Sequence, residues 1–327
     1  MFSLPCSLAL LTLFTLSAAL PSRPPLRTTE SELTPLPLII WHGLGDNYAR
    51  DGLKAVASLA EEVNPGTYVH IIKLADSPSG DQQATFLGNV TEQVAQVCEQ
   101  LASDPILSTA PAVNALGFSQ GGQFLRAYVE RCNFPPVRNL VTFGSQHNGI
   151  SHFQSCSFSD WLCRGAEALL RSGTWTEFVQ GHMVPAQYFR DPEELDAYLE
   201  HSSFLADINN EREVKNSTYR ENLMKLNRFG MFMFEDDITA VPKESAWFAE
   251  VNMTSGKVTP LRERQLYKDD WLGLKALDEQ GKLDFETVPG EHMRLTDTLL
   301  AKIFQEYFGP VDVDVPPSGA LMKQGVF

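Results

Sequence analysis

The sequence predicts an α/β protein in which helices cover both faces of a mainly parallel sheet. Short apolar runs alternate along the chain with segments whose apolar residues recur at helical spacing. Parallel strands need long crossover connections, so this alternation is typical of a parallel sheet between two helical layers. The chain has 327 residues, 43% of them hydrophobic, which is enough to form a large core within one domain.

The expected elements follow in order from near Pro37. Buried strands are expected where short apolar, partly β-branched runs occur, at 38–41, 68–74, 113–118, 140–143, 230–234 and 283–288. Amphipathic helices are expected at 52–63, 86–101, 123–131 and 297–308. Residues 145–225 break the alternation with helical segments such as 160–171 and 193–201, and we expect a helical insertion over the carboxyl edge of the sheet.

Both ends of the chain differ in composition from its middle. The first 20 residues carry no charged side chain, and an apolar run over 8–20 ends in small residues, as in a secretory signal peptide. The alternative is a membrane anchor, but the run is shorter than the roughly 20 residues needed to cross a bilayer. Residues 21–36 are rich in Pro, Ser and Thr and predict a flexible leader, and 310–327 predict a loosely ordered tail. The folded domain is then expected over 37–309.

An exported chain would acquire disulfides and glycans. Cys6 would leave with the signal peptide, so four cysteines remain for three possible pairings. The short spacing of Cys156 and Cys163 favours a local bridge, which leaves Cys98 to pair with Cys132. The sequons that could be glycosylated where exposed are Asn89, Asn216 and Asn252.

Charge and motif content exclude several classes of partner. The formal net charge of −15 would repel a phosphate backbone, so nucleic acid is not expected as a partner. The sequence has no paired histidine spacing or cysteine cluster typical of a metal site, and no phosphate-binding loop. We therefore expect neither a metal nor another cofactor.

A serine between two glycines follows the strand expected at 113–118. Gly117-Phe118-Ser119-Gln120-Gly121 fits the pattern G-x-S-x-G, with a strand before it and a helix after it. The bare pattern arises by chance in roughly one chain of this length in ten, but the flanking strand and helix remove most chance matches. A tight turn of this kind holds a serine hydroxyl at the carboxyl edge of the sheet, so Ser119 is the candidate nucleophile.

A serine hydroxyl is a poor nucleophile until a base accepts its proton, and histidine suits that task. With this elbow the order along the chain is serine, acid, histidine. Of the seven histidines, only His292 lies beyond residue 201. The acid should end a strand before it, where Glu235, Asp236 and Asp237 follow an apolar run. The pattern alone leaves Asp236 and Asp237 open.

Acyl transfer also needs two backbone N–H groups that stabilise an oxyanion. One should come from Gln120, directly after the nucleophile, and the other from Leu44 in the glycine-rich turn 41–46 after the first strand. His42 lies in this turn, and we expect it to support the loop rather than to act as the base. The residues therefore predict an acyl-transferring serine hydrolase of the α/β-hydrolase fold.

With these residues in place, the chain resembles the palmitoyl-protein thioesterases over about 37–309. Five segments look like segments of that family in the same order, namely Trp41-His42-Gly43-Leu44-Gly45-Asp46, Gly117-Phe118-Ser119-Gln120-Gly121-Gly122, Phe204-Leu205-Ala206-Asp207-Ile208-Asn209, Gly273-Leu274-Lys275-Ala276-Leu277-Asp278 and Gly290-Glu291-His292. Dispersed matches of this kind are far more specific than the G-x-S-x-G pattern by itself.

The resemblance also chooses between the two candidate acids. The catalytic aspartate of the family lies five residues before a proline, here Pro242, and this selects Asp237 with Asp236 as the alternative. One departure is visible, because some members carry adjacent cysteines where this chain has Tyr48-Ala49. That difference removes a possible local disulfide and touches no catalytic role.

The resemblance supports the disulfide pairs and adds further expectations. The family disulfides agree with the pairs Cys98–Cys132 and Cys156–Cys163, and Asn216 resembles a family glycosylation position. The family cleaves long-chain fatty acyl groups from cysteine thiols in lysosomal protein breakdown. This implies S-acylated proteins or peptides as substrates, an acyl groove formed by 145–225, and a lysosomal, vacuolar or secreted enzyme. The alternatives are a lipase or general carboxylesterase, and a non-catalytic acyl-binding protein.

Overall fold

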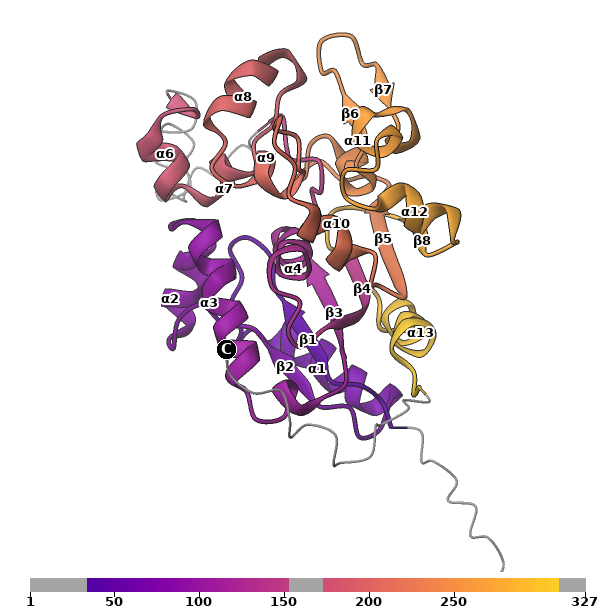
Figure 1. Cartoon of the computed structure of the whole chain (residues 1–327). Coiled ribbons are helices and arrows are strands. Elements are labelled where there is room, and N and C mark those ends of the chain that lie inside the picture. The colour runs from indigo at the N-terminus through magenta and orange to yellow at the C-terminus, as the bar shows by residue number, and fades with distance from the viewer. Residues whose placement is uncertain (1–33, 153–172, 312–327) are drawn as a thin grey trace, which may run out of the picture. The chain divides into compact units, whose positions relative to one another are not determined.

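A six-stranded, wholly parallel sheet forms the centre of the fold in the computed structural model, which describes residues 34–152 and 173–311. The strand order is β2-β1-β3-β4-β5-β8 (Figure 1). The strands are β1 (Leu38–Trp41), β2 (Val69–Ile71), β3 (Val113–Phe118), β4 (Val137–Phe143), β5 (Arg228–Phe234) and β8 (Leu283–Val288). A small antiparallel pair lies apart from this sheet, made of β6 (Glu250–Val251) and β7 (Val258–Thr259). The predicted fold class is confirmed.

Helices connect the strands, and five of the described α-helices lie between β4 and β5. The α-helices are α1 (Asp51–Val63), α2 (Pro78–Ala84), α3 (Val90–Ser103), α4 (Gln120–Arg131), α6 (Glu177–His182), α7 (Val184–Gln187), α8 (Leu195–His201), α9 (Leu205–Ile208), α10 (Ser217–Leu223), α11 (Gln265–Lys268), α12 (Leu274–Glu279) and α13 (Asp297–Phe308). Short 3-10 helices cover Leu107–Thr109, Pro192–Glu194, Lys243–Trp247 and Leu261–Glu263.

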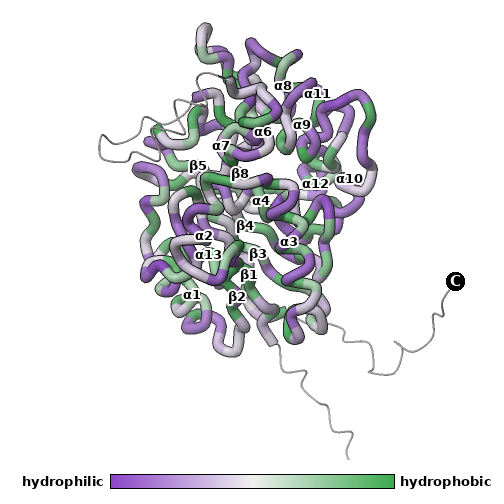
Figure 2. Tube along the Cα trace, turned by 90° about the vertical axis from the view of Figure 1, so that its left-hand side faces the viewer, coloured by the Kyte–Doolittle hydropathy of each residue, from purple (hydrophilic) through white to green (hydrophobic). Residues whose placement is uncertain are grey.

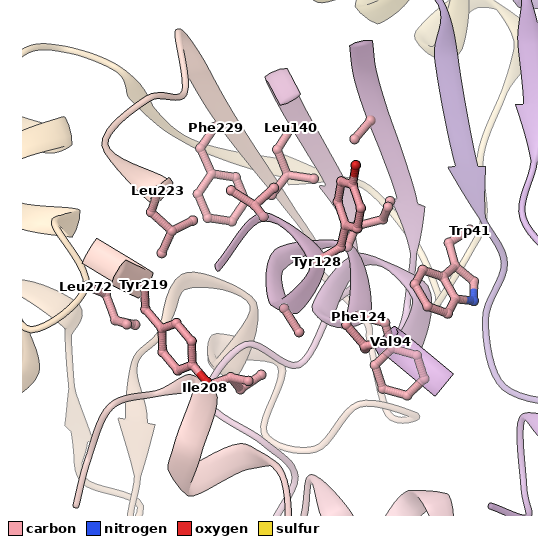
Figure 3. Packing of buried hydrophobic residues seen from close by; sticks show 14 of the residues in the cluster. Trp41, Val94, Phe124, Tyr128, Leu140, Ile208, Tyr219, Leu223, Phe229 and Leu272 are labelled. Carbon is pink, nitrogen blue, oxygen red and sulfur yellow. The ribbon is translucent and has the colours of Figure 1, made fainter. Parts of the chain in front are cut away.

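The four central strands β1, β3, β4 and β5 are buried on both faces of the sheet, as strands of a parallel sheet covered by helices require. Successive strand residues point to opposite faces, so Leu38 and Ile40 pack with residues of α1 and α13, whereas Ile39 and Trp41 pack with residues of α3 and α4. Figure 3 shows Trp41 beside Phe124 of α4, and the two rings meet edge to face with centroids 5.5 Å apart. Both helical layers therefore fix β1, whose carboxyl end leads into the candidate site.

The insertion between β4 and β5 lies at the carboxyl edge of the sheet. Two single-residue bridges join it to other loops, one between Leu87 and Met183 and one between His152 and Val241. Figure 1 shows helices α6 to α9 grouped beyond one end of the sheet. Its location is as expected from the sequence.

Several apolar side chains of the insertion belong to the main core. Val184, Tyr188 and Phe189 are buried in the cluster that covers one face of the sheet, and Trp175 packs against that cluster. Phe178 differs, because 60% of it is exposed. Core packing thus accounts for most of these side chains, and Phe178 is left facing solvent.

Hydropathy along the chain follows the layers. Figure 2 shows hydrophobic colour along the central strands and hydrophilic colour in the outer loops and on the outer sides of helices. Within 34–152 and 173–311, no helix combines the length and the apolar composition that crossing a bilayer requires.

Several element boundaries differ from those expected, and one difference has a clear local cause. The helix expected from Phe86 begins instead at Val90, because the Asn89 side chain accepts hydrogen bonds from the backbone N–H groups of Thr91 and Glu92. A side chain that satisfies these unpaired donors fixes the first turn of the helix. The sequon asparagine is therefore also a helix cap.

Helix α2 was missed in the sequence, and strand β2 is shorter than expected. The seven residues of α2 are too few to show an apolar period. Strand β2 ends at Ile71 rather than at Leu74, and the Leu74 N–H donates to Asp81 Oδ1 of α2 at 2.7 Å. The chain thus leaves the sheet after Ile71, and its next residues form a hydrogen bond with α2.

The ordered fold begins slightly before the expected boundary at Pro37. Leu36 is buried, and Thr34 pairs with Val311 in an antiparallel bridge. Leu36 and Thr34 therefore belong to the fold rather than to a flexible leader, and Val311 belongs to it rather than to a loose tail. The expected signal peptide, the helix at 160–171 and most of the expected tail lie outside the described residues.

A disulfide joins the two helices that cover one face of the sheet. Cys98 of α3 is bonded to Cys132, the residue that ends α4. This predicted pair is confirmed. Cys156 and Cys163 lie outside the described residues, so their pairing stays a prediction.

Candidate active site

Ser119 lies in the turn between β3 and α4. The strand ends at Phe118 and the helix begins at Gln120, three residues earlier than expected. The backbone of Ser119 has φ +52° and ψ −122°, a sparsely populated conformation that costs about 1–3 kcal/mol. The turn is therefore the strained strand-to-helix elbow that the sequence pattern predicts.

Glycines next to the serine allow the backbone segments to approach closely. A Cβ at Gly117 would collide with the backbone of Gly122, and a Cβ at Gly121 would collide with the carbonyl groups of Trp41 and His42. Both positions therefore require glycine. The close approach also places the start of α4 against the end of β1.

Three side chains from three strand ends form one hydrogen-bonded chain. His292 Nε2 lies 3.0 Å from Ser119 Oγ, and His292 Nδ1 lies 2.6 Å from Asp237 Oδ2. Asp237 follows β5 and His292 follows β8. The carboxylate can only accept, so Nδ1 donates to it and Nε2 is left to accept the serine proton. This is the arrangement of a base poised to activate a hydroxyl.

The environment distinguishes Asp237 from its neighbour Asp236. The Asp237 side chain is 1% exposed, and its second oxygen accepts hydrogen bonds from the N–H groups of Thr239 at 2.8 Å and Ala240 at 3.0 Å. Asp236 is exposed. The structure thus brings Asp237, and not Asp236, to the histidine.

The loop after β1 passes directly over the nucleophile. A Cβ at Gly43 would lie 3.1 Å from Ser119 Cβ, so only glycine fits without displacement. In the described part of the chain, no acceptor engages the backbone N–H of Leu44 or of Gln120. Both expected oxyanion donors are therefore unpaired.

A second close approach holds the imidazole ring. Gly144 follows β4 with φ +55°, and a Cβ there would lie 2.9 Å from His292 Cε1. Only glycine combines this backbone conformation with so near a ring. Any side chain at this position would push the imidazole away from Ser119.

Residues 37–292 match a family model described as palmitoyl protein thioesterase. The chain belongs to this family. Palmitoyl-protein thioesterase 1 of Caenorhabditis elegans is 39% identical over 276 residues, which are 84% of this chain and 92% of that protein. Palmitoyl-protein thioesterase 3 of Dictyostelium discoideum is 35% identical over 78% of this chain and 84% of that protein. The Lysosomal thioesterase PPT2 homolog of Drosophila melanogaster is 30% identical over 78% of this chain and 85% of that protein.

In this member of the thioesterase family, contacts that surround the site carry no signal in the sequence. The Tyr188 hydroxyl, from the insertion, donates to Gln120 Oε1 at 3.0 Å. His42 Nε2 lies 2.9 Å from Asp81 Oδ2, and Thr85 Oγ1 accepts from the Gly45 N–H at 2.9 Å. No periodicity or motif marks these partners, because they become neighbours only when the chain folds.

The other predicted sites lie away from the triad. The Asn89 side chain caps α3 and the exposed Asn216 caps α10, while Asn252 Nδ2 lies 3.3 Å from Glu193 Oε1. Glycosylation of all three stays a prediction. Among the described residues, no group of three or more His, Cys, Asp or Glu side chains could hold a metal ion.

Proposed function

We propose that this chain is a serine hydrolase that removes long-chain fatty acyl groups, palmitoyl among them, from cysteine thiols of proteins or peptides. The observation that carries the proposal is the hydrogen-bonded chain from Ser119 through His292 to Asp237, within a member of the palmitoyl protein thioesterase family. The names of the relatives supply the acyl group and the bond that is cleaved.

Acylation begins with proton transfer. His292 Nε2 accepts the Ser119 proton as Oγ attacks the thioester carbonyl carbon, and Asp237 holds the imidazole and stabilises its positive charge. The N–H groups of Leu44 and Gln120 donate to the oxyanion that forms. When the oxyanion collapses, the C–S bond breaks and the proton on Nε2 passes to the departing cysteine sulfur.

Deacylation uses the same groups in reverse order. A water molecule takes the place of the departed thiol, and His292 Nε2 accepts its proton as the water oxygen attacks the acyl-serine carbonyl carbon. The second oxyanion meets the same two N–H donors. Its collapse breaks the ester bond, returns the proton to Ser119 and releases the free fatty acid.

The insertion is the proposed site of the acyl chain, and the secretory pathway is the proposed location. The insertion lies at the carboxyl edge where Ser119 is placed, and Phe178 remains exposed within it. A relative named as a lysosomal thioesterase, together with the apolar start of the sequence, favours delivery to a lysosome or vacuole, or secretion.

The test compares a palmitoyl thioester with the matched palmitoyl oxygen ester at pH 5 and pH 7. His292 acts as the base towards Ser119 with either substrate, so the two substrates differ in the leaving group. A thiolate leaves with less help from a general acid than an alkoxide does. We expect kcat/KM to favour the thioester at both pH values.

The Ser119→Ala variant is the control for background hydrolysis. Equal kcat/KM values for the two substrates, or a preference for the oxygen ester, would contradict the proposal. Either result would favour a lipase or a general carboxylesterase.

A further inference from the structure

The direction of the Leu44 N–H is fixed by a carbonyl on the other side of its own peptide group. A trans peptide is planar, so its N–H and C=O point in opposite directions. The Gly43 carbonyl, which shares this peptide with the Leu44 N–H, accepts a hydrogen bond from the Asp46 N–H at 3.3 Å. His42 Nδ1 also lies 3.2 Å from it. Whatever holds that carbonyl therefore aims the Leu44 N–H.

The His42 ring is held in turn by Asp81 of α2. His42 and Asp81 side chains are fully buried, and His42 Nε2 lies 2.9 Å from Asp81 Oδ2. The same carboxylate accepts hydrogen bonds from the N–H groups of Tyr48 at 2.8 Å and Leu74 at 2.7 Å. Burial would raise the pKa of Asp81, but the hydrogen bonds from His42 and Leu74 outweigh that effect, and the pKa lies below its usual value. Asp81 is thus an ionised acceptor.

Two further side chains of the α2 segment hold the two peptide groups on either side of Gly45, the residue after Leu44. Thr85 Oγ1 accepts from the Gly45 N–H at 2.9 Å, and Gln82 Nε2 donates to the Gly45 carbonyl at 2.8 Å. The loop 42–48 is therefore bonded to the α2 segment both before and after Leu44, the residue whose N–H is free. No described contact of Asp81, Gln82 or Thr85 reaches the triad itself.

We propose that Asp81, Thr85 and His42 are positioning residues that aim the Leu44 N–H at the oxyanion. This inference rests on the proposed function, because it concerns the oxyanion of that reaction. The three side chains act through the backbone and touch no reacting atom. Their loss should weaken binding of the transition state while leaving binding of the acyl chain intact.

Thr85→Val is the deciding variant. Because Asp81 is fully buried, Asp81→Asn also lowers stability, whereas valine nearly matches threonine in shape and removes the acceptor of the Gly45 N–H together with the hydroxyl that donates to the Gln82 carbonyl. Thr67→Val is the matched control, since Thr67 is also buried and its hydroxyl donates to the Asn64 carbonyl at the far end of β2. Thr85→Ser restores the acceptor.

We expect Thr85→Val to lower kcat by about 10-fold or more, with KM within about 2-fold, because loss of a whole oxyanion donor costs about 10²–10³ in kcat. Thr67→Val and Thr85→Ser should keep wild-type kcat. A palmityl trifluoromethyl ketone, which forms a tetrahedral oxyanion with the serine, should lose affinity for Thr85→Val by the same factor as kcat. A hexadecyl thioether, which has no carbonyl, should bind unchanged.

Two results would overturn the inference. One is a Thr85→Val enzyme whose kcat and ketone affinity match those of Thr67→Val, and the other is an equal loss of affinity for the ketone and the thioether. Failure of the proposed function would look different, since wild-type protein would then not hydrolyse the palmitoyl thioester. The ketone comparison would still test the inference in that case, because the adduct needs only the serine and its oxyanion donors.

Discussion

The two oxygens of Asp237 have separate partners. Oδ2 faces His292 Nδ1, and Oδ1 accepts from the backbone N–H groups of Thr239 and Ala240, so the carboxylate cannot rotate without losing bonds at both ends. A buried carboxylate held in this way fixes the tautomer of the histidine and supports the positive charge that forms on it. The adjacent Asp236 is exposed and has none of these contacts to the histidine.

Asp237→Asn should therefore lower kcat by about 10⁴-fold, because an amide that donates to Nδ1 leaves Nε2 protonated and unable to act as a base. Asp236→Asn is the matched control and should change kcat by less than about 2-fold. Steady-state kinetics on a palmitoyl thioester measure both. Similar losses in the two variants would show that the acid is assigned to the wrong residue.

Much of this residue-level chemistry could be predicted from the sequence. The glycine pattern, the order along the chain and the scarcity of late histidines select Ser119 and His292. The choice between Asp236 and Asp237 was open, because alternation along a strand does not continue into the turn after it. That choice depended on the family resemblance, and burial now provides its physical basis.

Among the elements, the turn that carries Ser119 can form because two glycines let β1, β3 and α4 approach one another closely. The segments touch through backbone atoms, so no side chain can adapt to make room at Gly117 or Gly121. Helix α2 is a different case. Asp81 in this helix and Thr85 at its end bond a loop 39 and 40 residues earlier in the chain, and such long-range hydrogen bonds leave no periodic signal in the sequence. The sheet could therefore be predicted, but the support of its loops could not.

Gly121→Ala should destabilise the fold by about 3 kcal/mol, because overpacking against rigid backbone costs at the upper end of the usual range. Gly52→Ala is the control, since a Cβ at Gly52 in α1 would meet nothing within 4 Å and should stabilise the helix by roughly 0.5 kcal/mol. Urea unfolding followed by circular dichroism measures both. Equal stability of the two variants would contradict the close approach at the elbow.

At the scale of the whole molecule, a buried ion cluster joins the insertion to the segment that follows β7. Glu211 lies between Arg190 and Arg264 and also accepts a hydrogen bond from the Tyr198 hydroxyl at 2.6 Å. Burial would raise the pKa of Glu211, but the two guanidinium groups and these hydrogen bonds outweigh it and lower the pKa to about 2. The Glu211 carboxylate thus stays ionised well below the ordinary pKa of a glutamate.

The sign of the resulting pH dependence follows from this lowered pKa. The ionised Glu211 carboxylate stabilises the folded state fully above the ordinary glutamate pKa of about 4.5, and this stabilisation is lost as the pH falls towards 2. Glu211→Gln should therefore cost about 3 kcal/mol at pH 6, as for a broken buried ion pair, and progressively less below pH 4.5. Glu213→Gln, at an exposed neighbouring position, should change stability by less than about 0.5 kcal/mol. Urea unfolding at pH 6 and pH 3.5 measures the loss of stability in Glu211→Gln at each pH. A loss that is the same at both pH values would contradict the lowered pKa of Glu211.

The proposed function requires Ser119 as the nucleophile of a fatty acyl thioesterase, and kcat/KM of the Ser119→Ala variant with a palmitoyl thioester measures what this hydroxyl contributes. We expect a loss of at least about 10⁴-fold with unchanged thermal unfolding, since the oxyanion donors alone supply little of the rate. A folded Ser119→Ala protein that retains a substantial fraction of wild-type kcat/KM would contradict the account.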